Sequence, residues 1–437
     1  MRFRHGRIAA FAAAALVLAA CGGDETAEST TSDEPTSSEE PTQSDEPTDE
    51  TSDMASEEPS DEPVTRADAD LVIWADDTRA PVIEPFAEDF GAAEGITVAV
   101  QEVEFDQIRD LMSTQAPAGE GPDVFIGAHD WLGQLVSDGV VAPLDIANSD
   151  DFFPVATAAF NFEGNTYGLP YAIENIALVR NVDLVPQRPE TVEEMAEVAL
   201  ALLDAGEVTV PLAWQQPDVY HAYWLVTGAG GYVFGTNDDG SYDPTDLGID
   251  SEGGLEAGAI FADLVERGAI SGDVTYDIMR DSFAAGDAPF AVTGPWAVAD
   301  FGDVNYVVEP LPSVAGGEAR PFVGVQGFMV SSFAANELAA KTFVLDYMAT
   351  QDAQLQLFEA GNRPPALQAA FDAISDNPVV AGFGAAGANG YAMPSIPEMG
   401  SVWSAWADAY TLILDGGDPT EAFTAAATQI RNLIAGG

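Results

Sequence analysis

Three short apolar segments, separated by two amphipathic ones, open the folded part of this 437-residue chain. The sequences "LVIWA" at 71–75, "ITVAVQEV" at 96–103 and "DVFIG" at 123–127 are typical of strands, whereas apolar residues recur at helical spacing in 80–95 and 106–116. Strand, helix, strand, helix, strand is the pattern of a parallel sheet with crossover helices. We therefore expect an α/β fold.

Charged and polar side chains follow two of these predicted strands directly. Asp76, Asp77 and Arg79 follow the first strand, and His129 and Asp130 follow the third. Open α/β sheets bind their ligands at the carboxyl ends of the strands. We expect binding or chemistry at these residues.

The rest of the chain continues to alternate between helical and strand-like patterns. Helices are expected at 191–205 and 253–267, and a strand-like segment, "APFAVTGPWAV", is expected at 288–298. Further strands are expected at 304–309 and 324–331, before an Ala-rich helical tail. Because no fixed-period repeat is present, solenoids and propellers are excluded.

The N-terminus has the pattern of an export signal. Three arginines precede an apolar run at 8–18, which is too short to span a bilayer, and small residues then lead into Cys21, the only cysteine. This resembles a bacterial lipoprotein signal and predicts a signal peptide at 1–20 and lipidation of Cys21. An ordinary signal peptide with an incidental cysteine is the alternative. The lipid would anchor the protein to the extracellular face of the cell membrane, and no disulfide could form within the chain.

Residues 21–66 differ in composition from everything that follows them. They are rich in Glu, Asp, Ser, Thr and Pro, so they bury little and repel themselves, and we expect a disordered tether. The whole chain has 73 acidic and 14 basic residues and a net charge of −59. That charge repels nucleic acid and favours a neutral ligand over a phosphorylated or carboxylated one.

Most common catalytic and cofactor patterns are missing from the sequence. With three histidines and no HxxxH or Cys cluster, neither a metal site nor a cofactor is predicted. There is no GxSxG elbow, Walker loop or complete GxGxxG. Paired carboxylates leave a glycosidase open, although acidic residues are so abundant here that each pair is weak evidence.

Aromatic residues beside carboxylates suggest a carbohydrate ligand instead. An indole face packs against the apolar C–H face of a sugar ring, and carboxylates accept hydrogen bonds from its hydroxyls. Eight aromatic residues lie in segments with Pro, Gly and polar neighbours: Trp131, Tyr220, Tyr223, Trp224, Tyr276, Trp296, Trp403 and Trp406. Core packing is the alternative for each of them, and turn formers before Trp403 and Trp406 make it less convincing there.

Several stretches, in order from about residue 70 to the C-terminus, resemble one family: the extracellular solute-binding proteins of ABC sugar importers, and within it the maltose/maltodextrin-binding proteins. They are "LVIWADD", "GPDVFIGAHD", "GLPYAIENIALVRN", "GGYVFGTNDDGSYDPTDLGID", "AVTGPWAV", "VNYVVEPLPSVAGGEARPFVGVQGFMVS" and "MPSIPEMGSVW". The resemblance implies a type II periplasmic-binding-protein fold with two α/β lobes and a ligand cleft at the hinge between them. The expected N-terminal lobe comprises 67–173 and 327–372, and the C-terminal lobe 174–326 and 373–437.

The resemblance also implies roles for individual residues. Asp130 resembles a carboxylate that accepts hydrogen bonds from sugar hydroxyls, and Glu174 resembles a second one near the hinge. Trp296 and Trp403 resemble stacking platforms. Further matches are Tyr276 as a polar aromatic wall, Met393 as a lining residue, and Arg79, beside Asp77, as a cationic hydroxyl donor.

The sequence departs from the best-known branch of the family at three positions. Gly127 replaces a tryptophan just before Ala-His-Asp, and Ser404 and Ala407 replace an aromatic residue and an arginine after Trp403. These losses should remodel part of the groove. Trp131, Trp406 and Tyr220 are the candidates to compensate.

The implied function is that of a non-catalytic, monomeric carrier. It would bind malto-oligosaccharides, or another α-glucoside such as trehalose or a cyclic dextrin, and deliver them to ABC permease subunits. A secreted glycosidase and an adhesion lipoprotein without a small ligand are the alternatives.

Overall fold

The computed structural model describes residues 65–237 and 241–436. The predicted signal peptide, Cys21 and nearly all of the predicted tether lie outside the described residues. Folded contacts begin at the end of that tether: Gln101 Nε2 donates to the Thr65 carbonyl, and Arg66 pairs with buried Asp123 at 2.7 Å. The tether was predicted to extend through Arg66, so the folded part starts slightly earlier than expected.

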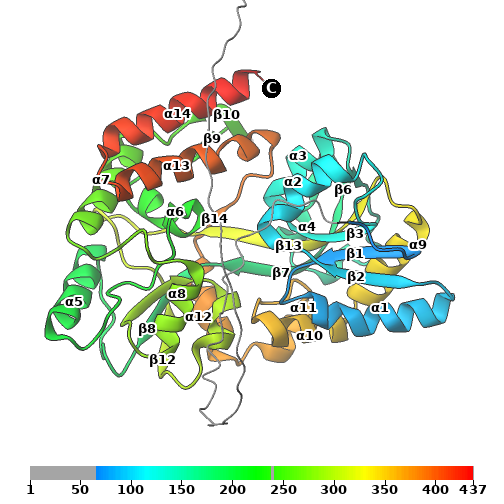
Figure 1. Cartoon of the computed structure of the whole chain (residues 1–437), viewed down its shortest axis with the longest axis horizontal. Coiled ribbons are helices and arrows are strands. Elements are labelled where there is room, and N and C mark those ends of the chain that lie inside the picture. Colours follow the sequence, from blue (N-terminus) through cyan, green and yellow to red (C-terminus); the bar gives the residue numbers. More distant parts are fainter. Residues whose placement is uncertain (1–64, 238–240, 437) are drawn as a thin grey trace, which may run out of the picture. The chain divides into compact units, whose positions relative to one another are not determined.

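The three predicted strands at the start of the folded part form one side of a seven-stranded sheet. β1 (Leu71–Ala75) pairs in parallel with β2 (Val98–Glu102) and with β3 (Val124–Ala128). The crossovers contain α1 (Ala80–Glu94) and α2 (Phe105–Gln115), as predicted (Figure 1). Every residue of β1 and β3 is buried, as in parallel sheets that are covered on both faces.

Two long strands complete this sheet and connect it to the rest of the fold. β13 (Phe322–Ser331) runs antiparallel to both β3 and β7 (Gly168–Asn175). The strand order is β14-β13-β3-β1-β2, where β14 is Tyr391–Ala392, and β4 (Val141–Ala142) also pairs with β13.

The hydrophobic core is divided between two bodies. One cluster draws its buried residues from 71–172 and 325–370, and we call this body the first lobe. The clusters of the second lobe draw theirs from 176–322 and 383–430. β7 and β13 pass from one lobe to the other (Figure 1). The fold is thus α/β with two lobes.

A three-stranded antiparallel sheet organises the second lobe. β8 (Ala177–Asn181) lies between β11 (Phe290–Thr293) and β12 (Tyr306–Glu309). Successive side chains of a strand point to opposite faces. Accordingly Leu178 belongs to the larger core cluster of this lobe, whereas Ala177 and Val179 belong to the smaller one.

Local sequence signals account for several element boundaries. α5 (Val192–Ala205) begins after Thr191, whose side chain accepts a hydrogen bond from Glu194 N, and ends at Gly206 in the left-handed region. The strand expected at 288–298 is wrong over its second half. β11 stops at Thr293, and Pro295 starts the 3-10 helix Pro295–Phe301 because proline fixes φ and lacks the N–H that a sheet requires.

The remaining elements complete the two lobes. The strands are β5 (Asn161–Phe162), β6 (Asn165–Thr166), β9 (Phe234–Thr236) and β10 (Tyr242–Leu247). The α-helices are α3 (Leu132–Ser137), α4 (Pro154–Ala159), α6 (Val219–Gly228), α7 (Glu252–Glu266), α8 (Tyr276–Ala284), α9 (Glu337–Thr342), α10 (Gln351–Gly361), α11 (Gln368–Ile374), α12 (Pro378–Gly387), α13 (Trp403–Leu414) and α14 (Pro419–Gly436). Shorter 3-10 helices span His129–Trp131, Ser149–Asp151 and Pro397–Ser401, and a π-helix spans Phe343–Met348.

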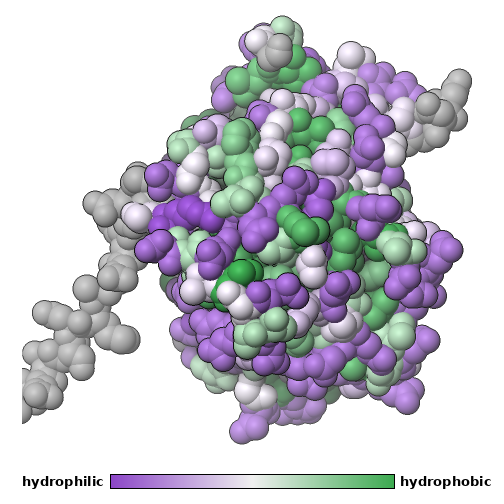
Figure 2. Space-filling model, turned by 90° about the vertical axis from the view of Figure 1, so that its right-hand side faces the viewer, coloured by the Kyte–Doolittle hydropathy of each residue, from purple (hydrophilic) through white to green (hydrophobic). Residues whose placement is uncertain are grey.

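The described surface is mixed in polarity. On the face shown in Figure 2, hydrophobic side chains form small patches between hydrophilic ones. Among the described helices, none is both long enough and apolar enough to cross a membrane.

Candidate ligand-binding site

The candidate site begins where β1 and β3 end. These strands are parallel neighbours, so the residues that follow them lie at the same edge of the sheet. Asp77, just after β1, is exposed to solvent, whereas Asp130, just after β3, is only 5% exposed. The predicted edge therefore holds one solvated and one buried carboxylate.

Asp130 is a buried carboxylate that links the two lobes. Burial raises its pKa to about 7, while the charge of Arg109 and a hydrogen bond from the Trp403 side chain act in the opposite direction. Trp403 is the first residue of α13, in the second lobe. Because a carboxylate can accept several hydrogen bonds, Asp130 has acceptor capacity left for a ligand.

Glu174, near the end of β7, is held by two neighbours. Its Oε1 accepts a hydrogen bond from Gln326 Nε2 at 2.7 Å, and its Oε2 accepts one from Arg363 Nε at 2.8 Å. The Glu174 side chain is 7% exposed and that of Arg363 is 11% exposed. This ion pair is therefore largely withdrawn from solvent and fixes the direction of the carboxylate.

Gly324 on β13 lies where Glu174 meets two residues of the second lobe. A methyl group at Gly324 would lie 3.5 Å from Glu174 Cγ, 3.5 Å from Met393 Cε and 3.7 Å from Tyr220 Oη. The Tyr220 hydroxyl is buried and has no hydrogen-bond partner among the described residues. A buried hydroxyl without a partner is unfavourable, so this atom marks a place where a ligand or water would bind.

Trp296 completes this group from the second lobe. Its ring centroid lies 6.2 Å from that of Tyr220, and the Arg363 guanidinium lies 5.5 Å from the ring. The six-membered ring of the indole folds back over Gly294, where a side chain would collide with it. Both Trp296 and Trp403 remain partly exposed. The structure thus brings Asp130, Glu174, Tyr220, Trp296, Met393 and Trp403 together at the junction of the lobes.

Tyr276 lies toward the outside of this junction. It is the first residue of α8 and is half-buried, with Arg280 5.9 Å from its ring. Burial and the charge of Asp300 raise its pKa, and the charges of Arg363 and of Asp77 from the first lobe also act on it. Tyr276 and Asp77 therefore approach the site from opposite lobes.

Arg79 does not present its charge to solvent in this structure. It is 2% exposed, its Nε donates to the Tyr171 hydroxyl, and its Nη1 is paired with Asp76. The guanidinium also lies 4.9 Å from the centroid of the Phe105 ring. Arg79 thus supports the edge of the first lobe from within, and only its buried Nη2 has no hydrogen-bond partner among the described residues.

Trp131 is likewise enclosed, at 7% exposure, and it occupies the space next to Gly127. A methyl group at Gly127 would lie 2.6 Å from the six-membered ring of Trp131. The indole also packs against Phe105, at 4.8 Å between ring centroids. The Trp131 indole therefore fills the space that a side chain at residue 127 would need.

Trp406, Tyr223 and Trp224 are core residues, so the expectation that Trp406 lies outside the core is wrong. All three are completely buried in the second lobe. Trp406 packs at 6.3 Å from Tyr410 and 6.1 Å from Phe423. The turn formers that precede it belong to Pro397–Ser401, one turn before the part of α13 that faces the core.

Arg363 and Gln326, both of which hold Glu174, were not among the predicted site residues. For Arg363 a usable signal was present: basic residues are scarce in this acidic chain, and one in an otherwise apolar and Gly/Pro-containing segment, "EAGNRPPAL", has to be paired if it is buried. Gln326 carries no such signal, because its partner is determined by the register between β13 and β7.

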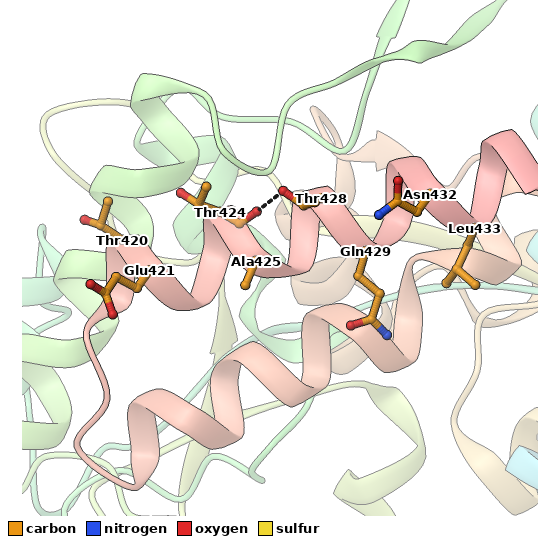
Figure 3. A pocket seen from close by; sticks show the side chains of 8 residues that line it. All are labelled: Thr420, Glu421, Thr424, Ala425, Thr428, Gln429, Asn432 and Leu433. Carbon is orange, nitrogen blue, oxygen red and sulfur yellow. Dashed lines mark hydrogen bonds between the residues drawn. The ribbon is translucent and has the colours of Figure 1, made fainter.

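A surface hollow on the second lobe is unrelated to this group. It follows one face of α14, from Thr420 to Leu433, and its labelled side chains all come from that helix (Figure 3). Its single ionisable side chain is that of Glu421. The hollow has neither paired carboxylates nor an aromatic face, so we do not assign the ligand site to it.

Comparisons with known proteins give the family of the chain. Residues 85–382 match the family described as bacterial extracellular solute-binding protein. The maltotriose-binding protein of Pyrococcus abyssi is 31% identical over 369 residues, covering 80% of this chain and 78% of the relative. The galactooligosaccharide-binding protein of Bacillus subtilis is 28% identical and covers 84% of this chain and 90% of the relative.

A third relative is described as a lipoprotein. The maltooligosaccharide ABC transporter solute-binding lipoprotein of Streptococcus pneumoniae is 28% identical over 312 residues, covering 68% of this chain and 72% of the relative. All three relatives are described as binding proteins. Because the family match spans more than half of the sequence, the chain belongs to the bacterial extracellular solute-binding protein family.

Proposed function

We propose that this protein binds a neutral malto-oligosaccharide between its two lobes and delivers it, chemically unaltered, to an ABC permease. The observation that carries this proposal is the meeting of buried acceptors and partly exposed aromatic rings at the lobe junction. Asp130 and Glu174 accept hydrogen bonds from sugar hydroxyls, and Trp296 and Trp403 pack against sugar rings. Tyr220 supplies a hydroxyl that has no other described partner.

The other candidate residues have supporting roles. Met393 and Tyr276 line the site, and Asp77 lies at its solvent-exposed edge. Arg79 reaches the ligand only if Nη2, which lacks a described partner, turns toward it. Trp131 stabilises the segment that carries Asp130 and replaces the side chain missing at Gly127.

Binding involves movement of one lobe against the other. We place the lobe boundaries at 67–173 with 327–372 and at 174–326 with 373–437, so that β7 and β13 form the hinge. A sugar that contacts both lobes favours the closed state in proportion to the contacts that only this state allows. The permease then recognises the closed form.

The export pattern at the N-terminus determines where this would happen. Lipidation of Cys21 would hold the protein, as a monomer, at the extracellular face of the cell membrane, and the acidic segment at 21–66 would act as a tether. The lipoprotein among the relatives supports this placement.

Titration calorimetry with maltose, maltotriose, trehalose, a cyclic dextrin and a galacto-oligosaccharide tests the proposal. We expect micromolar affinity, about −8 kcal/mol, for maltotriose. Galacto-oligosaccharide is the second candidate because a relative with 90% coverage is described as binding it. No heat with any glucan would overturn the malto-oligosaccharide assignment, and binding of the galacto-oligosaccharide alone would replace it.

Hydrolysis is tested in the same samples. A buried carboxylic acid with a raised pKa is also what a glycosidase needs as its general acid, and Asp130 has this property. A carrier leaves maltotetraose intact after prolonged incubation. Release of glucose or maltose that disappears in Asp130→Asn would show that the protein is an enzyme.

A further inference from the structure

The two histidines of the described part differ in how their ring nitrogens are used. His129 is completely engaged: its Nδ1 accepts a hydrogen bond from Val325 N at 3.1 Å, and its Nε2 lies 3.0 Å from the Met393 carbonyl oxygen. Because Nδ1 accepts and a carbonyl can only accept, the proton of neutral His129 is on Nε2. Burial lowers the pKa of His129 to about 4, so the ring is neutral at physiological pH.

His221 has the opposite arrangement. It lies in the first turn of α6 and is 4% exposed, and its Nδ1 is 3.0 Å from Oδ2 of Asp218, the residue that caps this helix. A carboxylate accepts hydrogen bonds, so its proximity favours the tautomer of the neutral ring with the proton on Nδ1, which leaves a lone pair on Nε2. Both ring nitrogens are buried, and neither makes a hydrogen bond of full geometry among the described residues: Nδ1 lies beside the Asp218 carboxylate, and Nε2 has no partner.

The surroundings of His221 place its ring beside the proposed sugar site. Its ring lies 5.8 Å from Trp296 at 85° and 5.6 Å from Tyr220. Asp106, on α2 of the first lobe, interacts electrostatically with both His221 and Asp218. His221 therefore lies between an aromatic platform of one lobe and an acidic residue of the other.

We propose that His221 is a further ligand-binding residue: its Nε2 accepts a hydrogen bond from one hydroxyl of the bound oligosaccharide, and Asp218 fixes the tautomer that makes this possible. The inference rests on the proposed function, and it adds a neutral acceptor to the carboxylates of Asp130 and Glu174. A neutral acceptor requires a hydroxyl that donates, so His221 would discriminate against ligands that carry only an acceptor at that position.

Nitrogen NMR of the whole chain, labelled with 15N-histidine, tests the tautomers directly. We expect His221 to carry its proton on Nδ1 and His129 to carry its proton on Nε2. Maltotriose should shift the Nε2 resonance of His221 and leave both nitrogens of His129 nearly unchanged. A proton on Nε2 of His221 in the free protein, or no shift on saturation with maltotriose, would overturn the inference.

Calorimetry with altered sugars tests the hydrogen bond itself. His221→Phe keeps a ring next to Trp296 but has no nitrogen, and we expect it to lower the affinity for maltotriose roughly three- to tenfold. A set of maltotrioses, each with fluorine in place of one hydroxyl, completes a double-mutant cycle. One of these sugars should bind the unaltered protein more weakly than maltotriose does. The same sugar should bind His221→Phe as well as maltotriose binds that variant. Equal maltotriose affinity of His221→Phe and the unaltered protein would reject the inference.

Two further variants separate a binding role from a structural one. Tyr232→Phe removes a ring hydroxyl that is hydrogen-bonded to Asp246 outside the site, and this variant should bind sugar as the unaltered protein does.

Asp218→Asn retains a residue that can cap α6, yet its amide can donate a hydrogen bond to Nδ1. The His221 proton should therefore move to Nε2, and the discrimination against the fluorinated sugar should be lost. Loss of the discrimination without a change of tautomer would contradict the role of Asp218. If the unaltered protein binds no sugar at all, the proposed function fails and the inference fails with it.

Discussion

Two acidic residues of the site are held in different ways, and the difference determines what each can do. Glu174 has a donor on each oxygen, from Gln326 and Arg363. Asp130 accepts hydrogen bonds from the Trp403 side chain and from its own backbone N–H, and the charge of Arg109 acts on it from further away. Asp130 therefore lacks the charged hydrogen-bond donor that Arg363 provides to Glu174.

The raised pKa of Asp130 predicts a pH-dependent free energy of unfolding. The folded protein holds this proton up to about pH 7, whereas the unfolded chain loses it near 3.8, so the stability contributed by the proton falls as the pH rises between these values. Asp130→Asn should therefore be more stable than the unaltered protein at pH 8, by roughly 2–4 kcal/mol, and about equally stable at pH 4. Urea unfolding at both pH values measures this, and a variant less stable at pH 8 would contradict it.

Gly127 is predicted to tolerate no side chain, because Trp131 and Met329 both occupy the space beside it. Gly127→Ala places a methyl group 2.6 Å from the indole, so we expect a loss of about 1–3 kcal/mol in the free energy of unfolding. Gly384, inside α12, is the matched control, because a methyl group there would have no other atom within 4 Å. Gly384→Ala should stabilise the protein by about 0.5–1 kcal/mol. Equal effects of the two substitutions in chemical denaturation would disprove the packing account.

At the scale of elements, α13 combines a core face with one end at the site. Its buried residues, Ala405, Trp406, Ala409, Tyr410 and Ile413, recur at helical spacing and pack into the second lobe. Trp403 begins the helix, remains partly exposed and hydrogen-bonds to Asp130 of the first lobe. Two tryptophans only three positions apart thus lie in different surroundings, one buried in the core and one partly exposed at the lobe junction.

Truncation of these two tryptophans should separate stability from binding. Trp406→Ala removes a completely buried indole and should lower the free energy of unfolding by about 3–5 kcal/mol. Trp403→Ala should affect stability less but weaken sugar binding at least tenfold, since it removes a platform and the donor to Asp130. Unfolding curves and calorimetry on both variants test this prediction. Normal sugar binding by Trp403→Ala would contradict it.

The sequence pattern was sufficient for the elements whose signals are local. The parallel strands β1, β2 and β3, their crossover helices and the capped start of α5 follow from periodicity and capping residues. The end of β11 was missed because the apolar pattern continues past it, and Gly294 and Pro295 outweigh that pattern. Among site residues, Asp130 follows a predicted strand, but the burial of Arg79 and the roles of Arg363 and His221 depend on contacts between distant segments.

At the scale of the whole described part, the two lobes share more than the strands that join them. His129 of the first lobe bonds to the Met393 carbonyl of the second, and a side chain at Gly133 of α3 would collide with the backbone of Ile396 and Pro397. The lobes therefore meet in several places besides the strands that they share. Under the proposed function, a sugar bound between them would add contacts to this interface.

Ligand binding should accordingly stabilise both lobes together. At a hundredfold excess of maltotriose over its Kd, the free energy of unfolding should rise by about 2.7 kcal/mol, and the melting temperature should rise with it. The same concentration of a sugar that calorimetry shows not to bind is the control. A melting temperature that maltotriose leaves unchanged would argue for a protein without a small ligand.

The central claim is that indole rings and buried carboxylates at the lobe junction hold a neutral sugar. The most direct measurement is the calorimetric affinity for maltotriose of the unaltered protein and of the double variant Trp296→Ala/Trp403→Ala. We predict micromolar binding by the first and none detectable by the second, with both proteins folded by circular dichroism. Equal affinity of the two proteins would contradict the account, because the sugar would then bind elsewhere.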